Sequence, residues 1–337
     1  MNTVKKSLLT TAISLGVALP SLNLVQAGET KGPEFYGMFY LTLDYIDNDK
    51  TSDNFWRLQS RNSRLGVQQE FVLANGLTSF YKAEFGVKID DATGFTQRDV
   101  YLGIKGEYGA VKAGRFKTPL RTTEGKIDLF NHLDSDIAAV LDGQVRVNNI
   151  VQYSTPKLGD SVVINAAFIP GENKDIDDDT RNENHLADAY SASAVYNSGN
   201  LYVAGGVDIN VAANKTHTDI QKDSGAHRVQ LAVQYKIDDL TLGAIAQHAQ
   251  DADNSKLKED AFIVNAGYQI QATKLKLQYG LNQGDQSKTD LHLYALGADY
   301  SLDKSSFVTF DVSATETINS GKSKLDQTFT VGFNQKF

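Results

Sequence analysis

The side chains that are able to do chemistry are spread along this chain without a recognisable catalytic arrangement. The six histidines show no metal-ligand spacing, and the chain has no Gly-x-Ser-x-Gly elbow and no phosphate-binding loop. The chain also lacks cysteine, so neither a thiol nucleophile nor a disulfide is available. We therefore predict that this protein is not an enzyme and that it needs no metal or cofactor.

An acidic cluster resembles a calcium-binding loop but lacks the glycine that such a loop needs at its sharp turn. Two interpretations stay open: a lipopolysaccharide-facing loop bridged by divalent ions, or an ordinary charged loop. The cluster contains Asp175, Asp177, Asp178, Asp179 and Glu183.

Arg64 lies in a segment with a clear period of two. It shares its phase with Gly66 and Gln68, whereas Leu65 and Val67 fall on the opposite face. This pattern predicts a strand that meets water on one face and apolar surroundings on the other. Arg64 is therefore expected to point toward water.

Arg98 lies in a less regular segment. It shares its phase with Val100, Leu102 and Ile104, so alternation alone would place it on an apolar face. Two explanations stay open: an inserted loop that covers an apolar inner surface, or a β-bulge that reverses the phase.

Alternation of this kind recurs along almost the whole chain and predicts sixteen strands. Short, tight connections alternate with long polar ones, which is the pattern of an outer-membrane β-barrel. Closure leaves no sheet edge exposed to lipid. The predicted strands are 34–46, 57–73, 76–88, 97–106, 110–117, 145–155, 161–170, 188–197, 200–210, 226–237, 239–250, 260–270, 274–283, 290–301, 304–315 and 325–337. In 290–301 neither face is clearly polar, which indicates either a subunit contact or a strand covered from inside.

The chain begins with features of a signal peptide. Lys5 and Lys6 precede a short apolar run, and Val25-Gln26-Ala27 fits a cleavage site. We therefore predict a signal peptide over 1–27 and a single transmembrane β-barrel domain over 28–337. The formal net charge of −8 and the absence of a basic run interleaved with aromatic residues argue against a nucleic-acid partner.

The last strand is apolar on one face up to the final residue. Phe329, Val331, Phe333 and Phe337 share this face. We expect this face to meet lipid and the strand to pair with the first one, which would close the barrel.

Several short motifs together resemble the Gram-negative general-diffusion porins, in their order and spacing over the chain. The resemblance implies a homotrimer of sixteen-stranded barrels in the outer membrane, with loop 118–144 folded into the lumen as a constriction. It also implies that the outer-membrane assembly machinery reads the terminal aromatic residue, Phe337. The motifs are Phe35-Tyr36-Gly37, Ser63-Arg64-Leu65-Gly66, Asn75-Gly76-Leu77, Arg98-Asp99-Val100-Tyr101-Leu102-Gly103, Gly109-Ala110-Val111-Lys112-Ala113-Gly114-Arg115 and the terminal Phe337.

The resemblance also assigns two sets of charges to the constriction. The basic wall would contain Arg64, Arg98 and Arg146, and the acidic loop Asp128, Asp134, Glu124 and Asp136. Opposed rows of charge across a water channel create a transverse field that penalises apolar solutes. Relatives carry a basic residue where this chain has Met38, so its basic wall is expected to be thinner.

The sequence thus predicts a water-filled channel for passive diffusion of ions and small hydrophilic solutes. Its surroundings would be outer-membrane lipid and lipopolysaccharide, and its ion preference mildly anionic or near neutral. Three alternatives stay open: a substrate-specific channel of the same fold, an outer-membrane β-barrel enzyme, and a soluble β-rich adhesin.

Overall fold

The computed structural model describes residues 32–48, 53–92, 94–171, 185–213 and 215–337. The predicted signal peptide over 1–27 and the acidic cluster from Asp175 to Glu183 lie outside these residues.

The described chain forms one closed antiparallel sheet in which β1 pairs with β17 and each strand, β2 and β3 apart, pairs with the next along the chain. The predicted sixteen-stranded barrel is thereby confirmed. The sheet contains seventeen segments because β2 and β3 are two parts of one interrupted strand, and both pair with β1. The strands are β1 (Glu34–Asn48), β2 (Asp53–Ser60), β3 (Arg64–Val72), β4 (Thr78–Gly86), β5 (Thr96–Gly106), β6 (Gly109–Lys117), β7 (Arg146–Ser154), β8 (Val162–Ile169), β9 (Ala189–Ser198), β10 (Leu201–Ala212), β11 (Gly225–Ile237), β12 (Leu240–Asp251), β13 (Lys258–Ile270), β14 (Thr273–Gly284), β15 (Thr289–Ser301), β16 (Ser306–Asn319) and β17 (Lys322–Lys336).

The seam between β1 and β17 shows how alternation sets the two faces of the sheet. Leu41 pairs with Phe333 on the outer face, and Asp44 pairs with Thr330 on the inner face. Phe337 continues the seam, because its N–H donates to the carbonyl of Gly37 (3.1 Å) and its own carbonyl accepts from the Gly37 N–H (2.8 Å).

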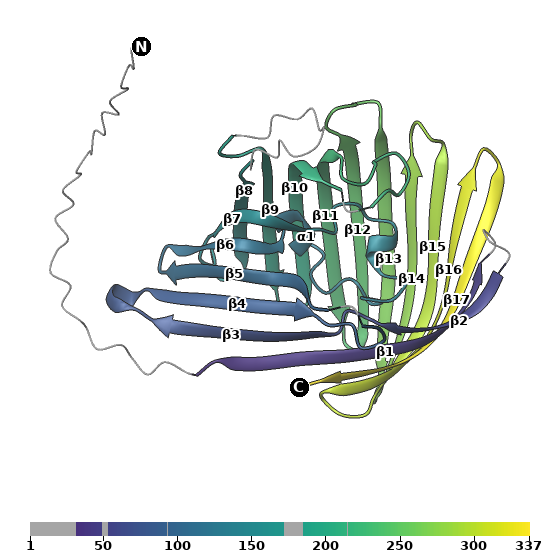
Figure 1. The fold of residues 1–337 in the computed structure, drawn as a ribbon, viewed down its shortest axis with the longest axis horizontal. Coiled ribbons are helices and arrows are strands. Elements are labelled where there is room, and N and C mark those ends of the chain that lie inside the picture. The colour runs from purple at the N-terminus through teal and green to yellow at the C-terminus, as the bar shows by residue number, and fades with distance from the viewer. Residues whose placement is uncertain (1–31, 49–52, 93, 172–184, 214) are drawn as a thin grey trace, which may run out of the picture.

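Short turns gather at one end of the barrel and most long connections at the other, as Figure 1 shows for β12 to β16. The last connection at the long-loop end differs from the predicted loop over 316–323. There β16 and β17 run on to the two-residue turn of Ser320 and Gly321, whose φ angles of 50° and 77° suit the twist of a two-residue hairpin.

The direction of Arg98 is settled by a β-bulge. The register between β4 and β5 shifts between Ala83 and Phe85, which leaves Arg98 and Asp99 together opposite Glu84. Beyond the bulge, Leu102 and Ile104 are exposed on the outer face. Arg98 therefore points inward although its neighbours in phase face out.

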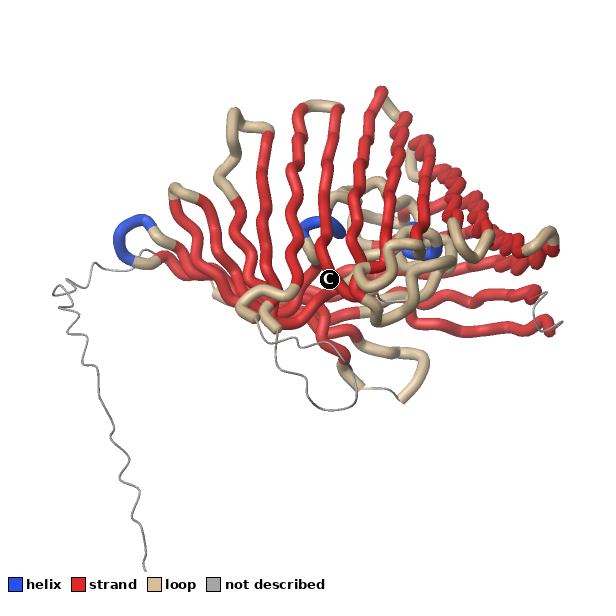
Figure 2. The backbone as a smooth tube through the Cα atoms, turned by 90° about the horizontal axis from the view of Figure 1, so that it is seen from above, coloured by secondary structure: helices blue, strands red, loops and turns tan. Residues whose placement is uncertain are grey.

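Within the described parts of the chain, helical structure is limited to short pieces: η1 (Ala74–Gly76), α1 (Pro119–Thr122) and η2 (Ile137–Ala139). No helix in the described residues is long and apolar enough to cross a membrane. Two of these pieces, α1 and η2, belong to loop 118–144. Figure 2 shows loop segments and helical turns lying inside the curve of the strands.

Candidate functional site

Loop 118–144 packs its apolar side chains onto the inner face of β10 to β15. Ile127, Ile137, Val140 and Leu141 are fully buried and form one cluster with small and aliphatic residues of that wall. The wall residues of the cluster are Ala204, Ala232, Ile245, Ala261, Ile263 and Leu293. The segment 290–301 has no clearly polar face because β15 is covered from inside: Leu293 and Ala295 are buried on its inner face, while its outer face is apolar and exposed.

Five glycines on this wall provide the space that the loop occupies. A Cβ atom added to any of them would meet a side chain or the backbone of loop 118–144, at 2.8 to 3.3 Å. We call this row the glycine seat; it contains Gly206, Gly243, Gly267, Gly280 and Gly297. Each lies on a different strand, so the loop approaches the sheet closely over five strands.

Amide side chains of the same wall satisfy the backbone of the loop. Asn265 Nδ2 donates to the Ile127 carbonyl (2.6 Å), and Gln278 Nε2 donates to the Ser135 carbonyl (2.7 Å). A buried carbonyl without a partner would cost free energy. These bonds therefore fix the path of the loop as well as its contact with the wall.

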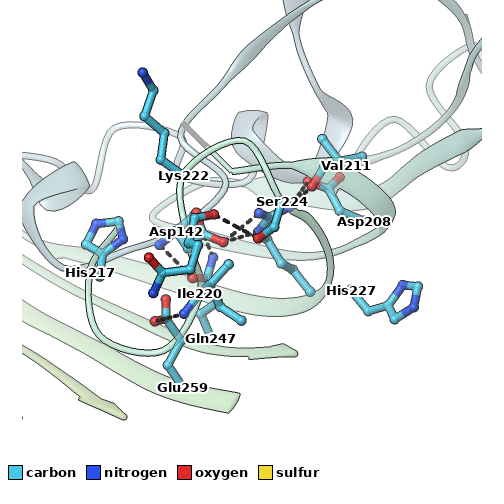
Figure 3. A network of polar contacts seen from close by, with 12 residues as sticks. Asp142, Asp208, Val211, His217, Ile220, Lys222, Ser224, His227, Gln247 and Glu259 are labelled. Carbon is cyan, nitrogen blue, oxygen red and sulfur yellow. Dashed lines mark hydrogen bonds and ion pairs between the residues drawn. The ribbon is translucent and has the colours of Figure 1, made fainter. Parts of the chain in front are cut away.

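A buried ion pair holds the returning end of the loop. Arg228 Nε donates to Asp142 Oδ2 (2.6 Å), and neither side chain is exposed to solvent. The Arg228 guanidinium also donates to the Val211 carbonyl (2.7 Å). Gln247 bonds both the N–H (2.9 Å) and the carbonyl (3.0 Å) of Asp142, as Figure 3 shows.

The connection between β10 and β11, described over 213 and 215–224, also contacts loop 118–144 and the inner wall. The Glu259 carboxylate accepts from the N–H groups of Thr218 (3.4 Å), Asp219 (3.2 Å) and Ile220 (3.3 Å), and Ile220 is fully buried. His217 Nε2 lies 3.1 Å from the Ala138 carbonyl of loop 118–144. Burial lowers the pKa of His217, so the neutral ring donates its Nε2–H there. The sequence indicated only a long polar loop at this position.

The inner face of β2 to β7 is charged instead. Arg57 and Arg61 both bond Asp44 on β1 (3.0 and 2.6 Å) and Asp134 of loop 118–144 (2.6 and 2.7 Å). Asp44 is fully buried, and the Asp134 side chain is 35 % exposed. The loop therefore reaches from one wall of the barrel to the other.

The three predicted arginines enter one network around two carboxylates. Arg98 Nε lies 2.7 Å from Glu84 and Arg64 Nε lies 3.7 Å from it, while Arg146 Nε lies 2.6 Å from Asp99. Lys82 joins the two groups, at 3.4 Å from Glu84 and 3.8 Å from Asp99. We call five arginines of this charged face the arginine wall: Arg57, Arg61, Arg64, Arg98 and Arg146.

The four predicted loop carboxylates separate into two groups. Asp134 meets the arginine wall, and Glu124 meets Lys117 (2.6 Å). Asp128 and Asp136 instead hold turns of the loop, because they accept from the N–H groups of Phe130 and of His132 and Ala138. Burial, with nearby Asp136 and Glu124, raises the pKa of Asp128 well above its usual range.

His132 joins the loop to the arginine wall. Its Nδ1 accepts from Asn62 Nδ2 (2.8 Å), and its Nε2 lies 3.4 Å from Arg64 Nη1. Burial and the positive charges of Arg64 and Arg98 lower its pKa to about 2. The ring is therefore neutral at pH 7.

Several residues of this network were missed by the sequence analysis. Arg61 had no periodic signal, because it lies in the break between β2 and β3, where Asn62 has a φ of 52°. Asp44 and Glu84 did carry a signal: each belongs to the polar phase of a predicted strand. The remaining members that were missed are Arg57, Lys82 and Asp99.

A closed barrel with an apolar outer face, a charged inner wall and an inserted loop defines an outer-membrane diffusion channel. The family model described as Gram-negative porin matches residues 10–322. The chain belongs to this Gram-negative porin family and is located in the outer membrane.

Individual relatives are distant in sequence. "Major outer membrane protein P.IB" of Neisseria sicca is 21% identical over 306 residues, which are 82% of this chain and 84% of that protein. The anion-selective porin from Comamonas acidovorans shares the fold with a TM-score of 0.76 at 18% identity, over 92% of this chain and 100% of that one. Salmonella typhi OmpF has a TM-score of 0.71 at 16% identity, over 90% of this chain and 97% of that one.

Proposed function

We propose that this porin passes ions and small hydrophilic solutes without catalysis and selects them by size and charge where loop 118–144 faces the arginine wall. The observation that carries the proposal is the position of Asp134. It bonds Arg57 and Arg61 across the lumen, while the apolar side of the same loop packs onto the opposite wall. Solutes would cross beside these fixed charges, which favour polar and charged species.

A small excess of positive charge supports a weak preference for anions. Among the described residues, seven cations and five carboxylates take part in the ion pairs of the arginine wall, Lys82 and Lys117, an excess of two positive charges. The cations are Arg57, Arg61, Arg64, Lys82, Arg98, Lys117 and Arg146, and the carboxylates are Asp44, Glu84, Asp99, Glu124 and Asp134. Most of the arginine charge is thus compensated, which argues for a mild preference.

The reversal potential of the channel in a planar bilayer under a salt gradient tests this proposal. We expect a small potential of the sign that anion permeation gives. The double variant Arg64→Ala, Arg98→Ala should shift it toward cations by a few-fold in permeability ratio. The control Lys322→Ala, Lys324→Ala removes the same charge from exposed positions on β17 and should leave the potential unchanged. Strong cation selectivity of the unaltered channel would contradict the proposal.

We further propose that the chain assembles as a homotrimer among lipopolysaccharide, as its family resemblance implies. Unheated and heated samples on a denaturing gel test the assembly. A trimer band that collapses to a single-chain band on heating is expected, and a single-chain band in both lanes would refute it.

We also propose that residues 1–27 are removed on export and that Phe337 acts as the assembly signal. The Phe337 ring contacts Phe39 edge to face at 5.3 Å, and it lies over Gly37, where a Cβ would come within 2.4 Å of it. Its deletion should reduce membrane insertion more than single-channel conductance. Normal insertion without Phe337 would oppose the signal role.

A further inference from the structure

A cavity opens at the short-turn end of the barrel, beneath loop 118–144. Its volume is about 760 Å³, and it is lined by the loop together with β8 to β12 and β14. The turn between β9 and β10 contributes Gly199 and Asn200, which fixes the cavity at this end. The space is large enough for a hydrated ion or a small organic solute.

Three lysines from three different elements line this cavity: Lys126 of the loop, Lys236 of β11 and Lys274 of β14. No carboxylate is among the cavity-lining residues, and none in the described chain forms an ion pair with these lysines. Asp299, which pairs with Lys274 in the strand register, already bonds Lys276 at 2.7 Å. Among the described residues, none of the three ammonium groups has a carboxylate within ion-pair distance, and the carboxylate nearest in register, Asp299, is shared with Lys276.

The contrast with the arginine wall is direct. There, each cation has a carboxylate within 4 Å, whereas these lysines have none. Like charges that line one cleft together raise the local potential and attract anions from solution. A compact ammonium group on a flexible stem suits a hydrated oxyanion that it meets as a point charge.

The loop side of the cavity is held in place by the wall. Gln234 Nε2 donates to the carbonyl of Lys126 itself (3.0 Å), and the Tyr202 hydroxyl donates to the Thr123 carbonyl (3.1 Å). The Tyr202 ring also lies against Gly125, whose φ is +55°. Lys126 is thus presented from a fixed backbone and not from a free loop.

We propose that this cavity, the lysine vestibule, binds small multivalent oxyanions, such as inorganic phosphate, as they cross the pore. The proposal rests on the channel function proposed above and adds to it a saturable site on the short-turn side. Occupancy of the site by a slowly crossing dianion obstructs the passage of monovalent anions. Single-channel chloride conductance should therefore fall as inorganic phosphate is added, more strongly from the short-turn side than from the other.

The test compares the unaltered porin with the triple variant Lys126→Gln, Lys236→Gln, Lys274→Gln in planar bilayers. We expect the phosphate concentration for half-inhibition to rise at least five-fold in the variant. Lys304→Gln is the matched control, because Lys304 is an exposed lysine in a short turn at the same end but does not line the cavity. The control should keep the response of the unaltered porin.

The possible outcomes distinguish a failure of the lysine vestibule from a failure of the proposed channel function. An unchanged half-inhibition in the triple variant, or an equal shift in Lys304→Gln, overturns the lysine vestibule and leaves the channel function intact. Chloride currents that phosphate does not reduce in the unaltered porin overturn it as well. Absence of any channel activity from correctly inserted, unaltered protein would instead refute the proposed function.

Discussion

The inner faces of β2–β7 and of β10–β15 belong to the same barrel but have opposite characters. The first carries the arginine wall with partly exposed charges, among which the Asp134 side chain is 35 % exposed. The second carries the glycine seat and a cluster of fully buried side chains. One side of the barrel interior therefore resembles an aqueous surface, and the other resembles the core of a soluble protein.

The difference shows what the inward residues of a barrel strand encode. Strands facing water can carry long charged side chains, because water and paired carboxylates satisfy them. Strands under an inserted loop need small residues for close approach and amides for its backbone. The ion pairs of the two walls also differ in their exposure to solvent. The pair of Arg228 and Asp142 is fully buried, and we call it dry. The pair of Arg57 and Asp134 is partly exposed, and we call it wet.

The largest effect is expected from breaking the dry ion pair. Asp142→Ala removes the 2.6 Å partner of the buried Arg228 guanidinium, which then keeps only the buried Asp208, at 3.7 Å. Removing one partner of a buried ion pair typically costs about 3–5 kcal/mol, and the remaining contact with Asp208 places the expected loss at the lower end of this range. Thermal unfolding of the detergent-solubilised barrel, followed by circular dichroism, would measure the loss.

Asp134→Ala is the matched control on the wet side of the same loop. Its carboxylate is partly exposed, and Arg57 and Arg61 keep Asp44 as a partner. We expect a loss of about 1 kcal/mol or less, as is common for solvent-screened pairs. Equal losses in the two variants would remove the distinction between dry and wet walls.

The sequence predicted the lipid-facing side of the barrel well, because hydrocarbon imposes the same period of two on every strand. It placed Arg64 correctly on the inner face by phase alone. It left Arg98 open, because a bulge depends on how β4 and β5 pair and not on either strand separately. The ion pair of Asp142 with Arg228 joins residues 86 positions apart, and no local pattern marks such a partner.

The lumen loop was predicted from family resemblance, whereas its seat was not predicted at all. In hindsight the glycines at inward positions of β10, β12, β13, β14 and β15 were a signal. Glycine is unfavourable within a strand unless another group approaches closely. The sequence does not show that these glycines are neighbours, because they lie on five different strands and come together only when the strands pair.

An intermediate effect is expected from filling the glycine seat. A Cβ at Gly206 would lie 2.9 Å from Leu120 Cα and 3.0 Å from Thr123 Cγ2. Because the first contact is with backbone, Gly206→Ala should push the loop from its wall toward the lumen. We expect a loss of about 1–3 kcal/mol in unfolding free energy, as for other overpacked sites, together with lower single-channel conductance.

The adjacent residue offers a control for this substitution. Gly205 points to the other face of β10, and its added Cβ would meet nothing closer than 3.8 Å. Gly205→Ala should keep both the conductance and the unfolding temperature of the unaltered porin. If Gly206→Ala behaves in the same way as Gly205→Ala, the glycines do not set the position of the loop.

The smallest effect concerns pH and the contact between the loop and the arginine wall. Burial and then Arg64 lower the pKa of His132 to about 2, so the ring stays neutral in the folded barrel while it takes up a proton in the unfolded chain below about pH 6.5. The unfolded state therefore binds more protons, and stability falls as the pH drops from 6.5 toward 2. This single group contributes at most about 1.4 kcal/mol of unfolding free energy per pH unit in that window.

In His132→Gln the unfolding temperature should fall less between pH 7 and pH 5 than in the unaltered porin. His227→Gln, which removes an exposed histidine, should keep the original slope. Because all carboxylates are retained in both variants, the difference between the two slopes isolates His132. Identical slopes would mean that the ring is solvated and that the loop meets the arginine wall through Asp134 alone.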